Sequence, residues 1–380
     1  MIIGVDYTAA AWQGAGIGRY TRELIHAAVA LDPTRHYQLF YAAAGLPTNS
    51  PYIADLQRLC ATYPHVQARP IPLTPRQLTI SWQRLRLPLL VEWFTGRLDL
   101  VHAPDFVLPP TRARTLLTVH DLTFLVRPEC FAPALQTYLR RTVPRSLKRA
   151  DLVLVDSHAS QHDLERLLGV QPERIALVYP GVDTKRFRPL PQPEIELVRQ
   201  RLGLPAAFLF FVGTLEPRKN IPRLIQAFAQ LAPRYPDLQL VIAGRKGWLY
   251  EAIFTSVTQL GLQARIRFLD FVADADLPAV YNLARAFVYP SLYEGFGLPV
   301  IEALACGTPT VTSNIASLPE VAGPVALLVD PFAIDAIAEG IERSLVMTTP
   351  HRLAGLQQAA QFSWEGAAQT LLECYDRVAA

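Results

Sequence analysis

Short apolar runs rich in β-branched and aromatic residues alternate along the chain with amphipathic helical patterns. This alternation is typical of βαβ units, in which helices connect the strands of a parallel sheet. The first half of the chain predicts strands at residues 2–6, 37–43, 98–103, 115–120 and 151–157. The second half predicts six more, at residues 208–214, 238–244, 266–271, 286–291, 308–313 and 325–330. The pattern therefore predicts an α/β protein with two doubly wound sheets in tandem.

The stretch "IALVYPGVDTKRFRPLPQPE" interrupts this pattern between the two series of strands. Proline becomes frequent there and the hydrophobic periodicity is lost, so we place a domain junction near Pro189. Two domains also agree with a length of 380 residues, which exceeds the size of an ordinary single core. We expect a first domain at residues 1–188, a second at 189–361, and a final amphipathic helix at 362–380 that crosses back to the first.

The composition indicates a compact globular protein, with 51% hydrophobic and 18% charged residues. The chain has no uninterrupted run of 18 apolar residues, the length expected of a membrane span. The start, "MIIGVDYTAA", enters a strand without a basic segment, so we expect no signal peptide and a cytoplasmic location. The four cysteines lack the spacing of disulfide or metal motifs, and we interpret them as reduced packing residues: Cys60, Cys130, Cys306 and Cys374.

Charge is unevenly distributed along the chain. Residues 1–190 hold 22 Lys and Arg against 15 Asp and Glu, whereas residues 191–380 hold 14 against 18. Much of the basic excess lies in "TRARTLL" and "RRTVPRSLKR", next to the Trp- and Arg-bearing stretch "PRQLTISWQRLRLPLLVEWF". One interpretation is arginines solvated on helix faces. The other is a surface that makes peripheral contact with an anionic membrane. No nucleic-acid partner is expected.

The stretch "SLYEGFGLPVIEALACGTP" holds two glutamates eight residues apart, Glu294 and Glu302. Its glycines and proline exclude one continuous helix, so Glu294 is expected in a loop and Glu302 in the first turn of a helix over 299–306. The amides of residues 296–298 then lie at a helix N-terminus, where the helix dipole attracts phosphate. The alternative is an ordinary turn in which Glu302 complements that dipole.

A second stretch, "FVGTLEPRKNIPRLIQAF", places Arg218 and Lys219 between a strand and a helix that we expect Asn220 to cap. Two cations next to a helix N-terminus can neutralise a diphosphate, which one cation would not. Solvated loop charges are the alternative interpretation. Because this loop and the glycine loop follow strands of the same sheet, we expect both at one edge, forming one phosphate site.

These two stretches resemble the retaining glycosyltransferases of family 4, which have the GT-B fold, two Rossmann-like domains facing across a cleft. The resemblance covers the whole chain through "GAGIGRYTREL", "TVHDL", "YPGVDTKRF", "LDFVADADLPAVYNLA" and "FSWEGAA". The sequence of these motifs is similar to that of the mannosyltransferase-like branch of the family. It implies transfer of a hexose, mannose from GDP-mannose first among the candidates, to an acceptor hydroxyl in polysaccharide or glycolipid synthesis.

The resemblance also implies roles for residues of the second domain. Glu302 would bind the ribose hydroxyls of the donor and Glu294 the hydroxyls of the transferred sugar. Arg218 and Lys219 would hold the diphosphate, and the remaining donor contacts would come from the backbone near Val272 for the base and from Phe296, Gly297 and Leu298 for phosphate. Many relatives read Gly-Arg where this chain reads Gly213-Thr214, so Arg218 is expected to supply the missing cation.

In the first domain, the resemblance implies that His120 faces the donor sugar and that a loop from Gly14 to Gly18 closes over the donor, through Gly16, Ile17 and Gly18. The same glycines could indicate a dinucleotide-binding loop with the sequence G-x-G-x-x-G. Arg19, however, stands at the position of the third glycine of that motif. His102 ends another strand and is an alternative ligand of the acceptor. The "ADAD" at 273–276 has no histidine partner, so we expect no metal and no cofactor besides the donor.

Three other functions compete with this hypothesis. A retaining glycosidase would use two carboxylates about 5 Å apart and would not need a diphosphate site. A nucleotide-sugar epimerase would use the donor without an acceptor. A noncatalytic two-domain sugar-binding protein would share the α/β architecture. The resemblance favours retention in which a donor phosphate oxygen takes the acceptor proton, and a double displacement through Glu294 stays open.

Overall fold

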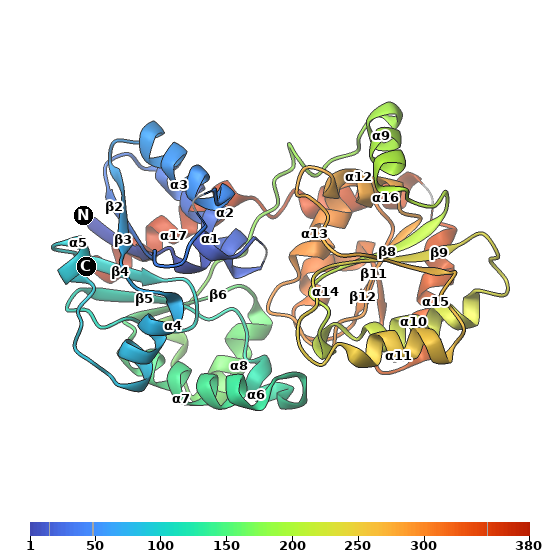
Figure 1. Cartoon of the computed structure of the whole chain (residues 1–380). Helices are drawn as coiled ribbons and strands as arrows, with labels where there is room; N and C mark the ends of the chain where they lie inside the picture. The colour runs from blue at the N-terminus through green and yellow to red at the C-terminus, as the bar shows by residue number, and fades with distance from the viewer. Residues whose placement is uncertain (15, 48, 348) are drawn as a thin grey trace. The chain divides into compact units, whose positions relative to one another are not determined.

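The computed structural model describes residues 1–14, 16–47, 49–347 and 349–380. The chain forms two compact units (Figure 1). The first consists of residues 1–122, 137–181 and 364–380, and the second of residues 123–136 and 182–363. The chain thus passes from the first unit to the second after Gly181, a few residues before the junction expected near Pro189, and returns to the first unit at Trp364. No sequence pattern indicated that segment 123–136 groups with the second unit.

The first unit is built on a seven-stranded parallel sheet in the order β3-β2-β1-β4-β5-β6-β7. The strands are β1 Ile2–Asp6, β2 His36–Ala42, β3 Val66–Ile71, β4 Leu100–Ala103, β5 Arg114–Thr118, β6 Leu152–Val155 and β7 Ile175–Leu177. The five predicted strands are confirmed. The sequence analysis missed the two edge strands, because β3 carries polar side chains and β7 lies in the proline-rich stretch taken as the junction.

Helices cover both faces of this sheet (Figure 1). They are α1 Thr8–Trp12, α2 Ile17–Leu31, α3 Pro51–Thr62, α4 Pro75–Leu78, α5 Glu92–Thr95, α7 Pro133–Arg149, α8 His158–Leu168 and α17 Trp364–Ala379. A π-helical turn, Thr79–Arg84, follows α4. Helix α17 packs on α2 and buries Leu371 and Tyr375, so the C-terminal helix belongs to the first unit, as expected.

The second unit has a six-stranded parallel sheet in the order β10-β9-β8-β11-β12-β13. All six predicted strands are confirmed: β8 Phe208–Val212, β9 Gln239–Ala243, β10 Ile266–Leu269, β11 Ala286–Tyr289, β12 Thr310–Ser313 and β13 Leu327–Val329. Most of their side chains are buried, since helices cover both faces of a parallel sheet. Such strands read as continuous apolar runs, which explains why the sequence revealed them.

The helices of the second unit are α6 Thr123–Val126, α9 Gln192–Leu202, α10 Ile221–Leu231, α11 Glu251–Gln259, α12 Leu277–Leu283, α13 Leu298–Ala305, α14 Leu318–Ala322, α15 Ile334–Leu345 and α16 Thr349–Ala359. Figure 1 shows α10, α11 and α15 on one face of the sheet and α12, α13 and α16 on the other. Phe208, Phe210 and Tyr281 form part of the aromatic core between the layers.

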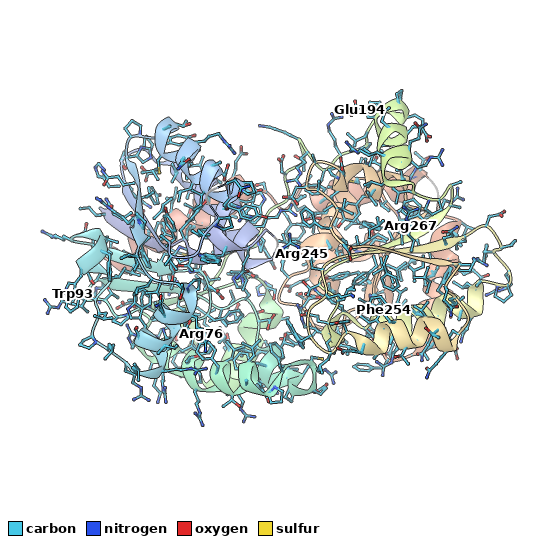
Figure 2. The ribbon with its side chains drawn as sticks, in the orientation of Figure 1. Arg76, Trp93, Glu194, Arg245, Phe254 and Arg267 are labelled. Atoms are coloured by element: carbon cyan, nitrogen blue, oxygen red, sulfur yellow. The ribbon has the colours of Figure 1, made fainter. Side chains whose placement is uncertain are left out.

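The four cysteines are free, and all except Cys60 are buried. In the described part of the chain, no helix combines the length and apolar character that crossing a membrane requires. Some apolar side chains of the first unit are nevertheless exposed, among them Leu85 and Trp93, which is 64% exposed. Trp93 and Arg76 are labelled in Figure 2.

Candidate active site

The sheet of the second unit has a topological switch point between β8 and β11. From β8 the chain continues to β9 on one side, whereas β11 continues to β12 on the other. In open α/β sheets, ligands bind beyond the carboxyl ends of the strands at such a point. Arg218 and Lys219 follow β8, and Glu294 follows β11. The amide of Leu292 donates to the carbonyl of Arg218 at 2.8 Å and joins the two loops.

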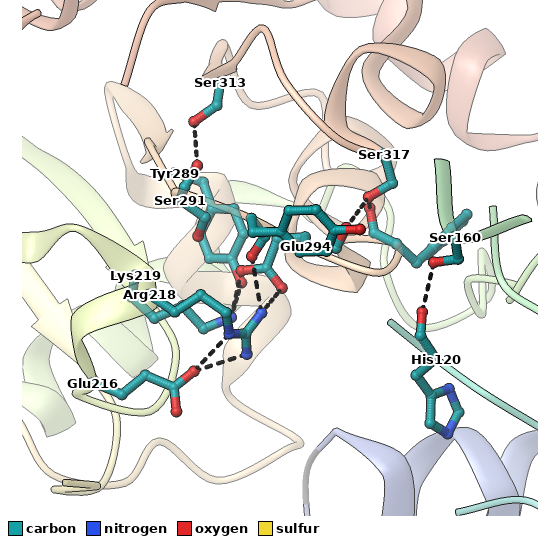
Figure 3. A network of polar contacts seen from close by, with 12 residues as sticks. His120, Ser160, Glu216, Arg218, Lys219, Tyr289, Ser291, Glu294, Ser313 and Ser317 are labelled. Atoms are coloured by element: carbon teal, nitrogen blue, oxygen red, sulfur yellow. Dashed lines mark hydrogen bonds and ion pairs between the residues drawn. The ribbon is translucent and has the colours of Figure 1, made fainter. Parts of the chain in front are cut away.

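Glu294 lies between the two predicted phosphate ligands. Its Oε1 accepts a hydrogen bond from Lys219 Nζ at 2.6 Å, and its Oε2 accepts one from Arg218 Nη1 at 2.5 Å. The carboxylate is only 6% exposed. Figure 3 shows the Arg218 guanidinium between Glu294 and a second carboxylate, Glu216, whose Oε1 accepts from Arg218 Nη2 at 2.7 Å. The structure therefore brings Glu294, Arg218 and Lys219 together as the sequence predicted.

These charges are buried rather than solvated. Lys219 is 7% exposed and donates a second hydrogen bond to the hydroxyl of Tyr289 at 2.5 Å. The Tyr289 ring lies beneath the ammonium, with its centre 4.9 Å from Nζ. Two positive and two negative side chains then balance one another: Arg218, Lys219, Glu216 and Glu294. The alternative of solvated loop charges is thus wrong for Lys219, because desolvated charges persist only when they are paired.

Burial of Glu294 opposes its charge, but the neighbouring Arg218 and Lys219 outweigh it and hold the pKa of Glu294 at about 2. Burial, together with the charge of Arg218, lowers the pKa of Lys219. Glu294 is therefore ionised at neutral pH, and both of its oxygens already accept hydrogen bonds from cations. Such a carboxylate is oriented to accept further hydroxyl groups, and its lone pairs are poorly available for nucleophilic attack.

Sequence reasoning missed Glu216 and Tyr289 as members of this group. Glu216 stands inside the stretch "FVGTLEPRKNIPRLIQAF", two residues before Arg218, but a glutamate near an arginine in a loop normally indicates two solvated charges. Tyr289 is the last residue of β11 and reads as an ordinary core aromatic. Nothing in the local pattern shows that its hydroxyl meets Lys219, since the two residues lie 70 positions apart.

The glycine loop leads directly into α13. Gly297 is the residue before the helix, with a positive φ of 106°, and a Cβ there would lie 2.7 Å from a methyl carbon of Leu318. The hydroxyl of Ser317 donates to the carbonyls of Glu294 and Phe296, both at 2.9 Å, and so fixes the loop. Leu298 is the first helical residue. The amides of residues 296–298 therefore lie at the N-terminus of α13, as predicted.

The expected position of Glu302 in the first turn is wrong. The helix begins at Leu298, one residue earlier than predicted, so Glu302 is its fifth residue. Glu302 is buried, and its Oε2 accepts a hydrogen bond from the hydroxyl of Tyr281 at 3.0 Å. This contact fixes the carboxylate beside α12, and its expected role with the ribose stays a prediction.

Gly213 directly follows β8 and contacts the residue that follows β9. Its amide donates to the carbonyl of Ala243 at 3.0 Å, and a Cβ on Gly244 would lie 1.8 Å from its carbonyl oxygen. Thr214 is exposed, and Val272 is buried just beyond β10. The predicted donor residues of this unit therefore follow strands at the same edge of the sheet.

Asn220 directly precedes α10 and is its N-cap residue, as expected, but its side chain does not provide the cap. Its backbone is left-handed, with φ at 59°, and its side chain makes no cap hydrogen bond. The side-chain amide donates instead to the carbonyls of Pro290 and Pro331, at 2.9 and 2.7 Å. Asn220 thus connects the loop after β8 with the segments that follow β11 and β13. These hydrogen bonds hold together three loops at the edge of the sheet where Glu294, Arg218 and Lys219 lie.

In the first unit, His120 lies just beyond β5 and is buried. Its Nδ1 is 2.6 Å from Asp156 Oδ2, and its Nε2 is 2.9 Å from the carbonyl oxygen of Pro104. Since both partners accept, both ring nitrogens donate and the imidazolium is the form that fits. Burial opposes this charge, but Asp156 raises the pKa of His120 to about 9. Asp156, which follows the neighbouring strand β6, was missed.

The predicted donor loop from Gly14 to Gly18 differs from the expectation. Residue 15 lies outside the described residues. Gly16, with φ at 58°, precedes α2, but Ile17 and Gly18 are the first residues of the helix rather than part of a loop. A Cβ on Gly18 would lie 2.4 Å from the carbonyl oxygen of Gln13. Gly18 thus permits the close approach of the preceding segment to α2.

His102 is a structural residue rather than an acceptor ligand. It is fully buried, with Nδ1 at 2.9 Å from the hydroxyl of Tyr375 on α17 and Nε2 at 3.1 Å from Thr118 Oγ1. Burial lowers the pKa of His102 to about 3, so the ring is neutral. Its hydrogen bonds connect α17 to the sheet. Among the described residues, no group of three or more His, Cys, Asp or Glu side chains could hold a metal ion.

Two Rossmann-like units and a buried carboxylate–cation cluster at a switch point fit a glycosyltransferase with the GT-B fold, and the comparisons with known proteins establish this class. The chain belongs to glycosyltransferase family 4: residues 14–186 match Glycosyltransferase Family 4 and residues 195–359 match Glycosyl transferases group 1. It is 34% identical to O-antigen chain mannosyltransferase B of Escherichia coli over 372 residues, 95% of each chain.

Two further comparisons agree. The chain is 31% identical over 278 residues to the serotype-specific mannosyltransferase WbdA of E. coli. The match covers 70% of this chain but only 34% of WbdA. The solved structure of sucrose-phosphate synthase from Thermosynechococcus elongatus has a TM-score of 0.77 at 24% identity, covering 100% of this chain and 99% of the other. This likeness shows the fold, and the mannosyltransferases show the family.

Proposed function

We propose that the protein is a retaining mannosyltransferase that moves mannose from GDP-mannose to a hydroxyl of a saccharide acceptor, in the synthesis of a polysaccharide or glycolipid. The observation that carries the proposal is the buried cluster of Glu294, Arg218 and Lys219 at the switch point, next to the N-terminus of α13. The cluster combines an ionised hydrogen-bond acceptor for sugar hydroxyls with cations for a diphosphate.

The leaving diphosphate gains negative charge as the glycosidic bond breaks. Arg218, Lys219 and the amides that begin α13 stabilise this charge, because oriented donors in a water-poor site need no reorganisation. Lys219 gives two of its three N–H donors to Glu294 and Tyr289, and we assign the third to a phosphate oxygen. The same charges make a metal ion unnecessary, so we propose that the reaction is metal-independent.

We propose that retention arises from front-face attack, and the way Glu294 is held argues against the alternative of a covalent intermediate. Both of its oxygens bind cations, so Glu294 orients hydroxyls of the transferred sugar and does not form a covalent intermediate. A phosphate oxygen of the leaving group then accepts the proton of the acceptor hydroxyl, and the acceptor attacks from the face that the diphosphate leaves. No side chain acts as a general base. Glu302 is proposed to bind the donor ribose and Val272 the base.

The nature of the sugar and of its acceptor is inferred from the relatives. A mannosyltransferase that is 34% identical over 95% of the chain supports mannose, and its name, O-antigen chain mannosyltransferase B, supports a saccharide acceptor. We further propose that the basic first unit contacts the inner face of the membrane, where lipid-linked acceptors lie. Arg76 and Trp93 are exposed there, a combination that suits an anionic lipid surface.

The proposal is tested by incubating the protein with GDP-mannose, UDP-glucose or ADP-glucose, each with and without mannose oligosaccharides, and measuring release of the nucleoside diphosphate and extension of the acceptor. Of the three donors, we expect only GDP-mannose to extend the acceptor. The rate of extension should be the same with and without EDTA. Conversion of the sugar nucleotide without any acceptor would identify an epimerase instead. Extension that requires added divalent cation would contradict the metal-independent mechanism.

A further inference from the structure

A guanidinium lies over an exposed aromatic ring at the same edge of the sheet as the Glu294 cluster. Phe271 follows β10 and is 54% exposed, although large apolar rings are usually buried. Arg245 follows β9, and its guanidinium carbon lies 4.9 Å from the centre of the Phe271 ring. Arg245 is labelled in Figure 2. Neither side chain has a role in the proposed mechanism.

Short backbone links connect this pair to the phosphate site. The carbonyl of Arg245 accepts from the amide of Leu215 at 2.9 Å, and Leu215 immediately precedes Glu216, the partner of Arg218. The amide of Gly244 donates to the carbonyls of Leu269 and Asp270, both at 3.0 Å, and so fixes the residue before Phe271. The position of the pair relative to Arg218 is therefore set by the sheet.

The spacing of the strands suits a nucleotide. Strands β8, β9 and β10 are consecutive neighbours in the sheet, and neighbouring strands lie about 4.8 Å apart. The residues beyond β10 thus lie about 10 Å from those beyond β8. A nucleoside diphosphate whose phosphates contact Arg218 and Lys219 can span this distance with its ribose and place its base beside Phe271.

The chemistry of the pair suits a guanine base. Exposed aromatic rings and arginine planes are the surfaces on which unpaired bases stack. The paired donors of a guanidinium also match the O6 and N7 acceptors of guanine, and uracil has no such pair of acceptors on one edge. We propose that the donor base stacks on Phe271 in place of the Arg245 guanidinium, which turns to the edge of the base and selects guanine over uracil. This inference rests on the proposed function, whose donor it specifies.

The test is the affinity of the purified protein for GDP, ADP and UDP, measured by titration calorimetry without any acceptor. We expect the wild-type protein to bind GDP most tightly. Phe271→Ala should weaken GDP binding about tenfold, since stacking on an aromatic ring contributes this order of affinity. Arg245→Met should reduce the preference for GDP over UDP about tenfold, because the paired hydrogen bonds to guanine are lost.

The chain offers a matched control in Phe332. This ring is 43% exposed and lies under the guanidinium of Arg127 at 4.8 Å, but it follows β13, at the opposite end of the sheet. Phe332→Ala should therefore bind GDP like the wild type. Unchanged GDP affinity in Phe271→Ala, or an unchanged preference for GDP over UDP in Arg245→Met, would contradict the proposed binding of the base by this pair. Either result would leave the proposed diphosphate site unaffected. Absence of binding to any nucleotide in the wild type would instead overturn the proposed function.

Discussion

The pairing of Glu294 with two cations prepares the site before the donor arrives. A carboxylate whose two oxygens are held at 2.5 and 2.6 Å cannot turn away, and its charge is fixed by the same contacts. Glu216 fixes Arg218 in turn through Nη2 and Nε. Donors and acceptors that are oriented in advance are the most effective way to stabilise charge in a transition state. In the proposed mechanism, the cluster therefore supports catalysis as well as binding the donor.

Lys219 should contribute mainly to the chemical step. We expect Lys219→Met to lower kcat by about 10²- to 10³-fold, the usual loss when one donor to a developing negative charge is removed. The exposed Lys185→Met in the same unit is the matched control and should retain wild-type kcat. The measurement is steady-state kinetics with GDP-mannose and an acceptor, together with the melting temperature. A folded Lys219→Met enzyme with kcat within about fivefold of wild type would exclude this role.

His120 and Asp156 form the corresponding buried pair of the first unit. Each follows one of two adjacent strands, and their contact at 2.6 Å keeps the ring charged although it is buried. Because both ring nitrogens are engaged, His120 also holds the carbonyl of Pro104 in place. The pair thus fixes the segment after β4 against those after β5 and β6.

This pair should make stability depend on pH. The pKa of His120 rises from 6.5 to about 9 on folding, so its stabilisation is complete below pH 6.5 and is lost as the pH rises through 9. We expect the free energy of unfolding to fall by up to roughly 3 kcal/mol across this window. Urea unfolding of wild type and Asp156→Asn measures it, and the variant should lose the dependence. Parallel curves for the two proteins would contradict a charged His120.

Among the elements, the candidate site depends on how closely the strand ends approach. The loop after β8 and the loop after β9 touch at Gly213 and Gly244, and a Cβ on Gly244 would not fit between them. The same contact connects the phosphate ligands after β8 with the Arg245–Phe271 pair. A change here should therefore affect the donor site without removing any ligand.

Gly244→Ala should weaken GDP binding by more than about tenfold, because its Cβ would lie 1.8 Å from the carbonyl oxygen of Gly213 and push the two loops apart. Gly261→Ala is a matched control. Gly261 also has a positive φ, of 65°, but a Cβ added there would meet no atom within 4 Å, so only backbone strain of about 1 kcal/mol is expected. Calorimetry and thermal melting distinguish the two. Equal GDP affinity in both variants would show that the close approach is unimportant for the donor.

The elements differ in how clearly the sequence indicates them. All strands of the second unit were predictable, because burial on both faces produces unbroken apolar runs. The polar edge strand β3 and the three-residue β7 give no such run. The grouping of the candidate ligands Glu294, Arg218 and Lys219 was predictable because each follows a strand and lies in a motif. Their partner Glu216, and Asp156 beside His120, depend on tertiary pairing that local patterns do not specify.

Across the whole molecule, the opposite charges of the two halves of the chain fit a division of labour. The basic excess lies in residues 1–190 and the acidic excess in residues 191–380, the half that contains most of the predicted donor residues. The second compact unit holds 17 Lys and Arg against 17 Asp and Glu, so it has no net charge to attract a diphosphate and depends on the local cations after β8. A basic unit with exposed Leu85 and Trp93 can associate with anionic lipid.

We therefore expect the protein to float with liposomes that contain phosphatidylglycerol and not with liposomes of phosphatidylcholine alone, and salt should weaken the association. Trp93→Ala should reduce flotation. Leu197→Ala, which removes a similarly exposed apolar residue from the second unit, serves as the control and should not. Equal flotation with the two lipid compositions would contradict an electrostatic contact, and no flotation with either would favour a soluble acceptor.

Above all, we propose that Glu294, held by Arg218 and Lys219, supports transfer of mannose with retention. Proton NMR can follow the reaction of GDP-α-mannose with a defined saccharide acceptor and record the new anomeric signal as it appears. We expect an α-linked product from the start of the reaction, and loss of that product in Glu294→Gln. A β-linked product, or full activity in Glu294→Gln, would contradict the proposal.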